Sequence, residues 1–107
     1  MYIVIALYDT DQGQAERCIF ITEGRDIGKA VEAARQVEKL SYTFSKPGAC
    51  VSILSIPLDI MIHASGKNLV FVRRRTSEGW TEEWFDKLAQ RAALNADMMR
   101  RLHKFGA

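Results

Sequence analysis

The sequence predicts a single α+β domain, in which a largely antiparallel sheet of four to five strands is covered by two helices in the order β-β-α-β-β-β-α. The block from Ala49 to Val72 is the densest in branched aliphatic residues, and residues 58–63 within it alternate with the period of a strand. Two other stretches repeat apolar residues at helical spacing. The length of 107 residues is that of one ordinary domain.

The first two strands are expected to form an antiparallel hairpin. Residues 2–8, YIVIALY, are apolar on both faces, which is typical of a strand inside a sheet. A turn cluster over residues 9–14, with Gly13, precedes a second strand at residues 17–22. The two strands are therefore predicted to pair with each other.

A surface helix should follow this hairpin and lie across the sheet. Asp26 is placed to accept hydrogen bonds from the free N–H groups of the first helical turn. Pro47 and Gly48 stop any continuation. The apolar stripe over about four turns comprises Ile27, Ala30, Val31, Ala34, Val37, Leu40 or Ser41, and Phe44.

The central apolar block contains at least one strand. Cys50 to Ile56 reads as a strand, Pro57 has no N–H for the ladder, and the pattern resumes from Leu58 to His63. Whether residues 50–63 are one kinked strand or two stays open. A hairpin loop at residues 64–68 then leads into a last strand, Leu69 to Arg75, whose three final arginines are expected to point into water.

A long C-terminal helix is predicted from Glu82 to about Lys104. Thr81 is a plausible N-cap, and Trp80 with Phe85 fits a hydrophobic staple. Such a helix is over roughly 30 Å long, whereas a six-residue strand spans roughly 20 Å. One end of the helix should therefore overhang the sheet.

Two apolar strips follow from the helical spacing of this segment. The strip expected to face the sheet lies in one arc of about 140° and comprises Phe85, Leu88, Ala89, Ala92, Ala96, Met99 and Leu102. Leu94, Met98 and Phe105 fall outside that arc on the later turns. Exposed residues of these types need a cover. A loop of the same chain, or a dimer or partner helix, could supply it.

Basic residues gather toward the C-terminal end. Residues 1–66 carry six Lys and Arg against eight Asp and Glu, whereas residues 67–107 carry nine against five, giving net charges of −2 and +4. Arg73, Arg75, Arg100, Arg101 and Lys104 form the candidate basic binding surface. Near Trp80 and Trp84 they could bind nucleic acid. Arg74 should diverge from Arg73 and Arg75 in a strand, and a solvated or acid-paired face is the alternative.

The composition predicts a cytoplasmic protein. No stretch approaches the run of about 20 apolar residues that a membrane-spanning helix needs, and the N-terminal segment reads as a strand and not as a signal peptide. Cys18 and Cys50 are expected to be small buried side chains in a reducing compartment. No membrane association is expected.

No catalytic, metal or cofactor site is expected. Asp9 to Gly13 lacks the later ligands of a calcium loop, and Gly24 to Ala30 has the wrong glycine spacing for a phosphate loop. His63 and His103, the only histidines, have no surrounding motif. The sequence therefore favours a protein that is not an enzyme and needs no cofactor, although a small enzyme without a recognisable motif is a third hypothesis.

The expected function is that of a non-catalytic binding protein, resembling an inhibitor or adaptor, which engages a protein partner or forms a homodimer through the C-terminal helix and its basic flank. Direct nucleic-acid binding through Arg73–Arg75 with Arg100, Arg101 and Lys104 is the alternative. Size and fold class also suggest, by analogy alone, an accessory protein of a phage or mobile element.

Overall fold

The computed structural model of the chain describes residues 1–22, 26–56 and 68–106. Its elements confirm the α+β class and the order β-β-α-β-β-β-α. They are β1 (Tyr2–Thr10), β2 (Gly13–Thr22), α1 (Ile27–Arg35), β3 (Cys50–Ser55), β4 (Leu69–Thr76), β5 (Gly79–Trp84) and α2 (Lys87–Gly106), with two short 3₁₀ helices, η1 (Val37–Lys39) and η2 (Tyr42–Ser45), between α1 and β3.

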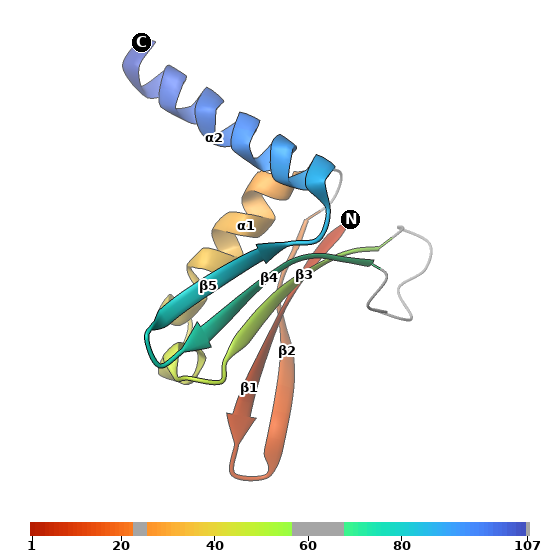
Figure 1. The fold of residues 1–107 in the computed structure, drawn as a ribbon, viewed down its shortest axis with the longest axis vertical. Coiled ribbons are helices and arrows are strands. Elements are labelled where there is room, and N and C mark those ends of the chain that lie inside the picture. The colour runs from red at the N-terminus through yellow and green to blue at the C-terminus, as the bar shows by residue number, and fades with distance from the viewer. Residues whose placement is uncertain (23–25, 57–67, 107) are drawn as a thin grey trace.

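The sheet has five strands in the order β2-β1-β3-β4-β5, and every neighbouring pair is antiparallel. The predicted β1–β2 hairpin is present, and β1 has a neighbour on each side, as its two apolar faces predict. Helix α1 covers one face of the sheet (Figure 1). Gly79 has a φ of +139°, and this left-handed conformation lets the chain turn tightly from β4 into β5.

The hydrophobic core lies between α1 and the sheet. The Asp26 side chain accepts a hydrogen bond from the Lys29 N–H at 3.2 Å, so the predicted cap is confirmed. Helix α1 ends at Arg35, earlier than expected, but Val37 and Phe44 from η1 and η2 continue the buried stripe. Leu40 is 62% exposed and does not belong to it.

The C-terminal helix begins five residues later than predicted, because residues 79–84 form β5. Trp80, Glu82 and Trp84 share one face of this strand, so the cap at Thr81 and the staple to Phe85 are wrong. Asp86 caps the helix instead, since its Oδ1 accepts from the Leu88 N–H at 3.0 Å and from the Ala89 N–H at 3.2 Å. The predicted strand at residues 58–63, and whether it continues β3, lie outside the described residues.

Helix α2 packs against α1 and does not lie along the sheet. Ala89 is buried and Ala93 packs against the core, so contact is made by the early turns of the helix. The rest of α2 extends away from the body of the molecule, which is the predicted overhang (Figure 1). Within the described residues, no helix is both long enough and apolar enough to cross a membrane.

Candidate functional site

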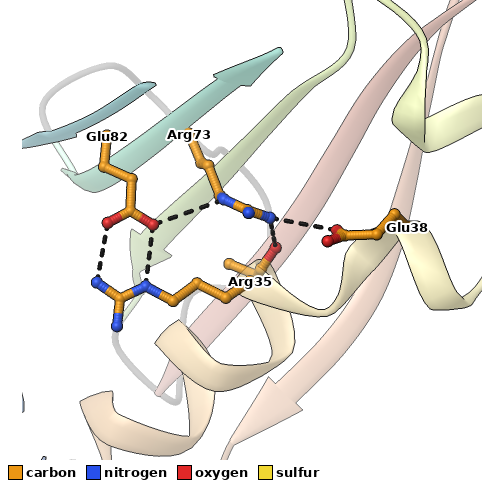
Figure 2. Close-up of polar contacts among 5 residues, drawn as sticks. Arg35, Glu38, Arg73 and Glu82 are labelled. Carbon is orange, nitrogen blue, oxygen red and sulfur yellow. Dashed lines mark hydrogen bonds and ion pairs between the residues drawn. The ribbon is translucent and has the colours of Figure 1, made fainter. Parts of the chain in front are cut away.

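The most buried charged side chain of the described residues is Arg73 on β4, which sits in a polar cluster between the sheet and α1 (Figure 2). Its Nη1 donates to the Ala34 carbonyl oxygen at 3.1 Å and to Glu38 Oε2 at 3.3 Å. Its Nε lies 3.5 Å from Glu82 Oε2, and its guanidinium stacks over the Trp80 ring at 4.1 Å. The cation therefore meets two carboxylates, a carbonyl oxygen and an aromatic ring, while its buried Nε has an ion-pair contact with Glu82 but no hydrogen bond.

Glu82 also joins β5 to α1. Arg35 Nε and Nη2 donate to its two carboxylate oxygens at 2.9 and 2.8 Å, a bidentate pair. These hydrogen bonds lower the pKa of Glu82, and the same bonds raise the pKa of Arg35. The polar cluster thus fixes the β4–β5 hairpin to the C-terminal end of α1.

The arginine run of β4 therefore does not form one exposed basic surface. Arg73 is only 9% exposed and belongs to the polar cluster, which corrects the expectation that it points into water. Arg75 lies on the same face, where it donates to the carbonyl oxygens of Ser45 and Thr76. Arg74 diverges from both, as predicted, and is an exposed residue 3.5 Å from Glu83. Arg73 therefore matches the alternative prediction, in which these arginines pair with acidic residues.

The basic residues of α2 are placed differently. Arg101 is exposed, and its guanidinium lies 3.5 Å from Asp97, one turn earlier. The side chains of Arg100 and Lys104 lie outside the described part of the structure. The structure therefore brings neither Arg73 nor Arg75 to a surface shared with Arg101.

The predicted apolar partner strip is exposed where it is described. Leu94 and Met98 are 59% and 60% exposed, and the Phe105 side chain lies outside the described residues. Leu94 also borders a hollow of about 290 Å³ between α1 and α2, with Val31, Trp84 and Ala93 among its apolar walls and Arg35 among its polar ones. A partner side chain of moderate size could enter this hollow.

A second exposed strip of α2 escaped the sequence analysis. Leu88 is 78% exposed and Leu102 is 64% exposed, and Ala92 and Met99 are exposed as well, although all four were expected to face the sheet. The helix uses Ala89 and Ala93 for contact instead, because small side chains let it approach α1 closely. Trp80 and Trp84, four residues apart, fit one face of a helix as well as one face of a strand, so the local sequence carries no signal that the helix begins later.

The cysteines lie nearer to solvent than expected. Cys18 is exposed and Cys50 is half-buried, and both are free thiols. The prediction that Cys18 is buried is therefore wrong, since β2 is an edge strand whose outer residues are uncovered. Across residues 1–22, 26–56 and 68–106, no three His, Cys, Asp or Glu side chains gather closely enough to hold a metal ion.

No protein family, curated protein or solved structure matched this chain.

Proposed function

We propose that this protein is a non-catalytic binding protein, of the inhibitor or adaptor kind, that engages a protein partner through α2. The observation that supports this most strongly is the difference in exposure between the small and the large apolar residues of α2. Its small residues Ala89 and Ala93 pack on the body, whereas Leu94 and Met98 are more than half exposed. Large apolar side chains gathered on a projecting helix are typical of an interaction surface.

The physical basis of such binding is burial of the exposed side chains in an apolar groove of the partner. Leucine and methionine at three- and four-residue steps are the usual anchors of a helix that binds in a groove. Methionine adapts to irregular surfaces because its side chain is unbranched. The positive charge of the later turns, including Arg101, would favour an acidic rim around that groove.

Direct nucleic-acid binding is the weaker candidate. Two of its six predicted cations, Arg73 and Arg75, already have acceptors within the domain. Trp80, which was to supply a stacking platform, is stacked on Arg73 instead. A protein partner accounts for the exposed apolar side chains, which a phosphate backbone would not cover.

A photo-crosslinking side chain at Met98 tests the proposal in cells that express the full chain. The matched control places the same group at Gln12, an exposed position in the β1–β2 turn at the opposite end of the molecule (Figure 1). We expect a discrete protein adduct from position 98 and none from position 12. Equal adducts from both positions, no adduct, or an adduct with nucleic acid alone would overturn the proposal.

A further inference from the structure

The solvent-facing side of α2 carries residues at the spacing of a coiled-coil seam. Leu88, Ala92, Asn95, Met99 and Leu102 follow one another at steps of four, three, four and three residues, and all five are exposed. This alternation keeps side chains along a single line that faces a second helix. We call these five residues the seam.

The seam is free along its whole length. At 100° per residue it lies about 120° around the helix axis from Ala89 and Ala93, which contact the body. It extends for roughly 21 Å. A helix of another chain can therefore lie along it without displacing α1.

We propose that the seam pairs with the seam of a second copy of this chain, with the two helices antiparallel and the two-fold axis at Asn95. This inference rests on the proposed function, because it takes α2 as the binding element, and it assigns an occupant to a strip of α2 other than Leu94 and Met98. The occupant is a second copy because the order of side chains along the seam is complementary to itself when reversed.

The reversed register matches side chains in size and polarity. Leu88 would pack against Leu102 of the partner subunit, and Ala92 against Met99 of the partner subunit, a small side chain facing a large one. Asn95 would meet Asn95 of the partner subunit, and two amides can satisfy each other because each has a donor and an acceptor. A single asparagine in an apolar seam also fixes register.

The dimer should be weak, because the contact is short. Each copy contributes three large apolar side chains, Leu88, Met99 and Leu102, so the interface falls at the small end of specific interfaces. The expected dissociation constant is on the order of micromolar. Leu94 lies about 120° from the middle of the seam and stays accessible in the dimer.

Sedimentation equilibrium of the full chain tests the association. We expect a shift from 12.1 kDa toward twice that mass as the protein concentration rises through the micromolar range. Leu102→Glu should weaken the dimer at least about tenfold. The control Leu40→Glu changes a leucine of nearly equal exposure on the body of the molecule and should leave the dimer unchanged.

A chain that stays monomeric at every concentration, or equal loss of the dimer in both variants, would overturn the inference. Circular dichroism of both variants checks that they fold. A monomeric chain that still forms the Met98 adduct with another protein would refute the second copy and leave the proposed function standing.

Cysteine crosslinking tests the direction of the pair, in a chain whose Cys18 and Cys50 are replaced by alanine. Asn95→Cys should form a disulfide with itself. Leu88→Cys and Leu102→Cys should each stay reduced alone and crosslink when mixed, because two copies of position 88 are roughly 21 Å apart. Self-crosslinking of Leu88→Cys would show a parallel pair and contradict the proposal.

Discussion

Arg73 shows how one residue can reverse the interpretation of a motif. Three consecutive arginines at the end of a strand suggest a basic surface, yet alternation places the first and third on the face that α1 covers. Burial of a cation is tolerated only where acceptors surround it. Glu38 and the Ala34 carbonyl oxygen accept hydrogen bonds from Arg73, and Glu82 adds an ion pair, so three separate segments stabilise the cation.

We predict that Glu82→Gln destabilises the domain by roughly 1–2 kcal/mol, because it removes the charge shared by Arg35 and Arg73. The matched control is Glu83→Gln, on the next residue of β5. Its carboxylate lies 3.5 Å from the exposed Arg74, and the expected change is within about 0.5 kcal/mol. Urea unfolding measures both free energies of unfolding. Equal losses in the two variants would show that the polar cluster does not stabilise the domain more than an exposed ion pair does.

The stability of the protein should also fall in acid through Glu82. The hydrogen bonds from Arg35 lower the pKa of Glu82 in the folded state. The ionised carboxylate therefore makes its full contribution to folding stability at pH values above its ordinary pKa of 4.5. That contribution is lost as the pH falls below 4.5 toward the folded pKa. Unfolding free energies measured from pH 6 to pH 3 should decline less steeply in Glu82→Gln than in the wild type. Parallel declines would contradict this assignment.

At the scale of elements, the sequence predicts the start and the buried face of α1 well, but it predicts the end of α1 and the start of α2 poorly. The apolar residues of α1 form one continuous stripe, and the sequence offers one N-cap, Asp26. Together they determine where the helix begins and which face is buried. Residues 80–86 instead offer two caps, Thr81 and Asp86, and the three residues around Glu82 fit the first turn of a helix or a strand. Pairing with β4 favours the strand, and such long-range pairing is not visible in local spacing.

The N-cap of α2 can be tested directly. We expect Asp86→Ala to cost about 1 kcal/mol, because two N–H groups of the first turn lose their acceptor. Asp97→Ala, in the same helix, removes a carboxylate that lies 3.5 Å from the exposed Arg101 and acts at longer range on Arg35, and it should cost less than about 0.5 kcal/mol. Thermal unfolding compares the stability of the two variants. No loss of stability in Asp86→Ala would mean that the helix does not begin at this cap.

The apolar side chains of α2 should be dispensable for folding. Met98→Gln and Leu102→Gln, at protein concentrations where the chain is monomeric, should change the unfolding free energy by less than about 0.5 kcal/mol. Ala89→Leu should cost about 1–3 kcal/mol, since Ala89 is buried in the hydrophobic core and a larger side chain would have to displace its neighbours. A large loss in the glutamine variants would mean that these side chains pack within the domain.

At the scale of the whole molecule, the fold consists of a sheet with its α1 cover and a helix that leaves it, with extents of 50 × 35 × 21 Å. The class, the order of elements and the existence of an overhang follow from local patterns. The direction of α2 does not, because this helix has apolar residues on most of its circumference and several faces could serve as the contact. Small residues decide which face approaches α1.

Hydrogen–deuterium exchange of the full chain tests most directly whether another chain covers α2. The backbone amides of residues 98–106 belong to turns beyond the contact with α1, so in a monomer they should exchange fast. We predict that their exchange slows as protein concentration rises, or when the protein captured at position 98 is added, while exchange in β1, β3 and β4 stays constant. Fast exchange of residues 98–106 under every one of these conditions would contradict the account.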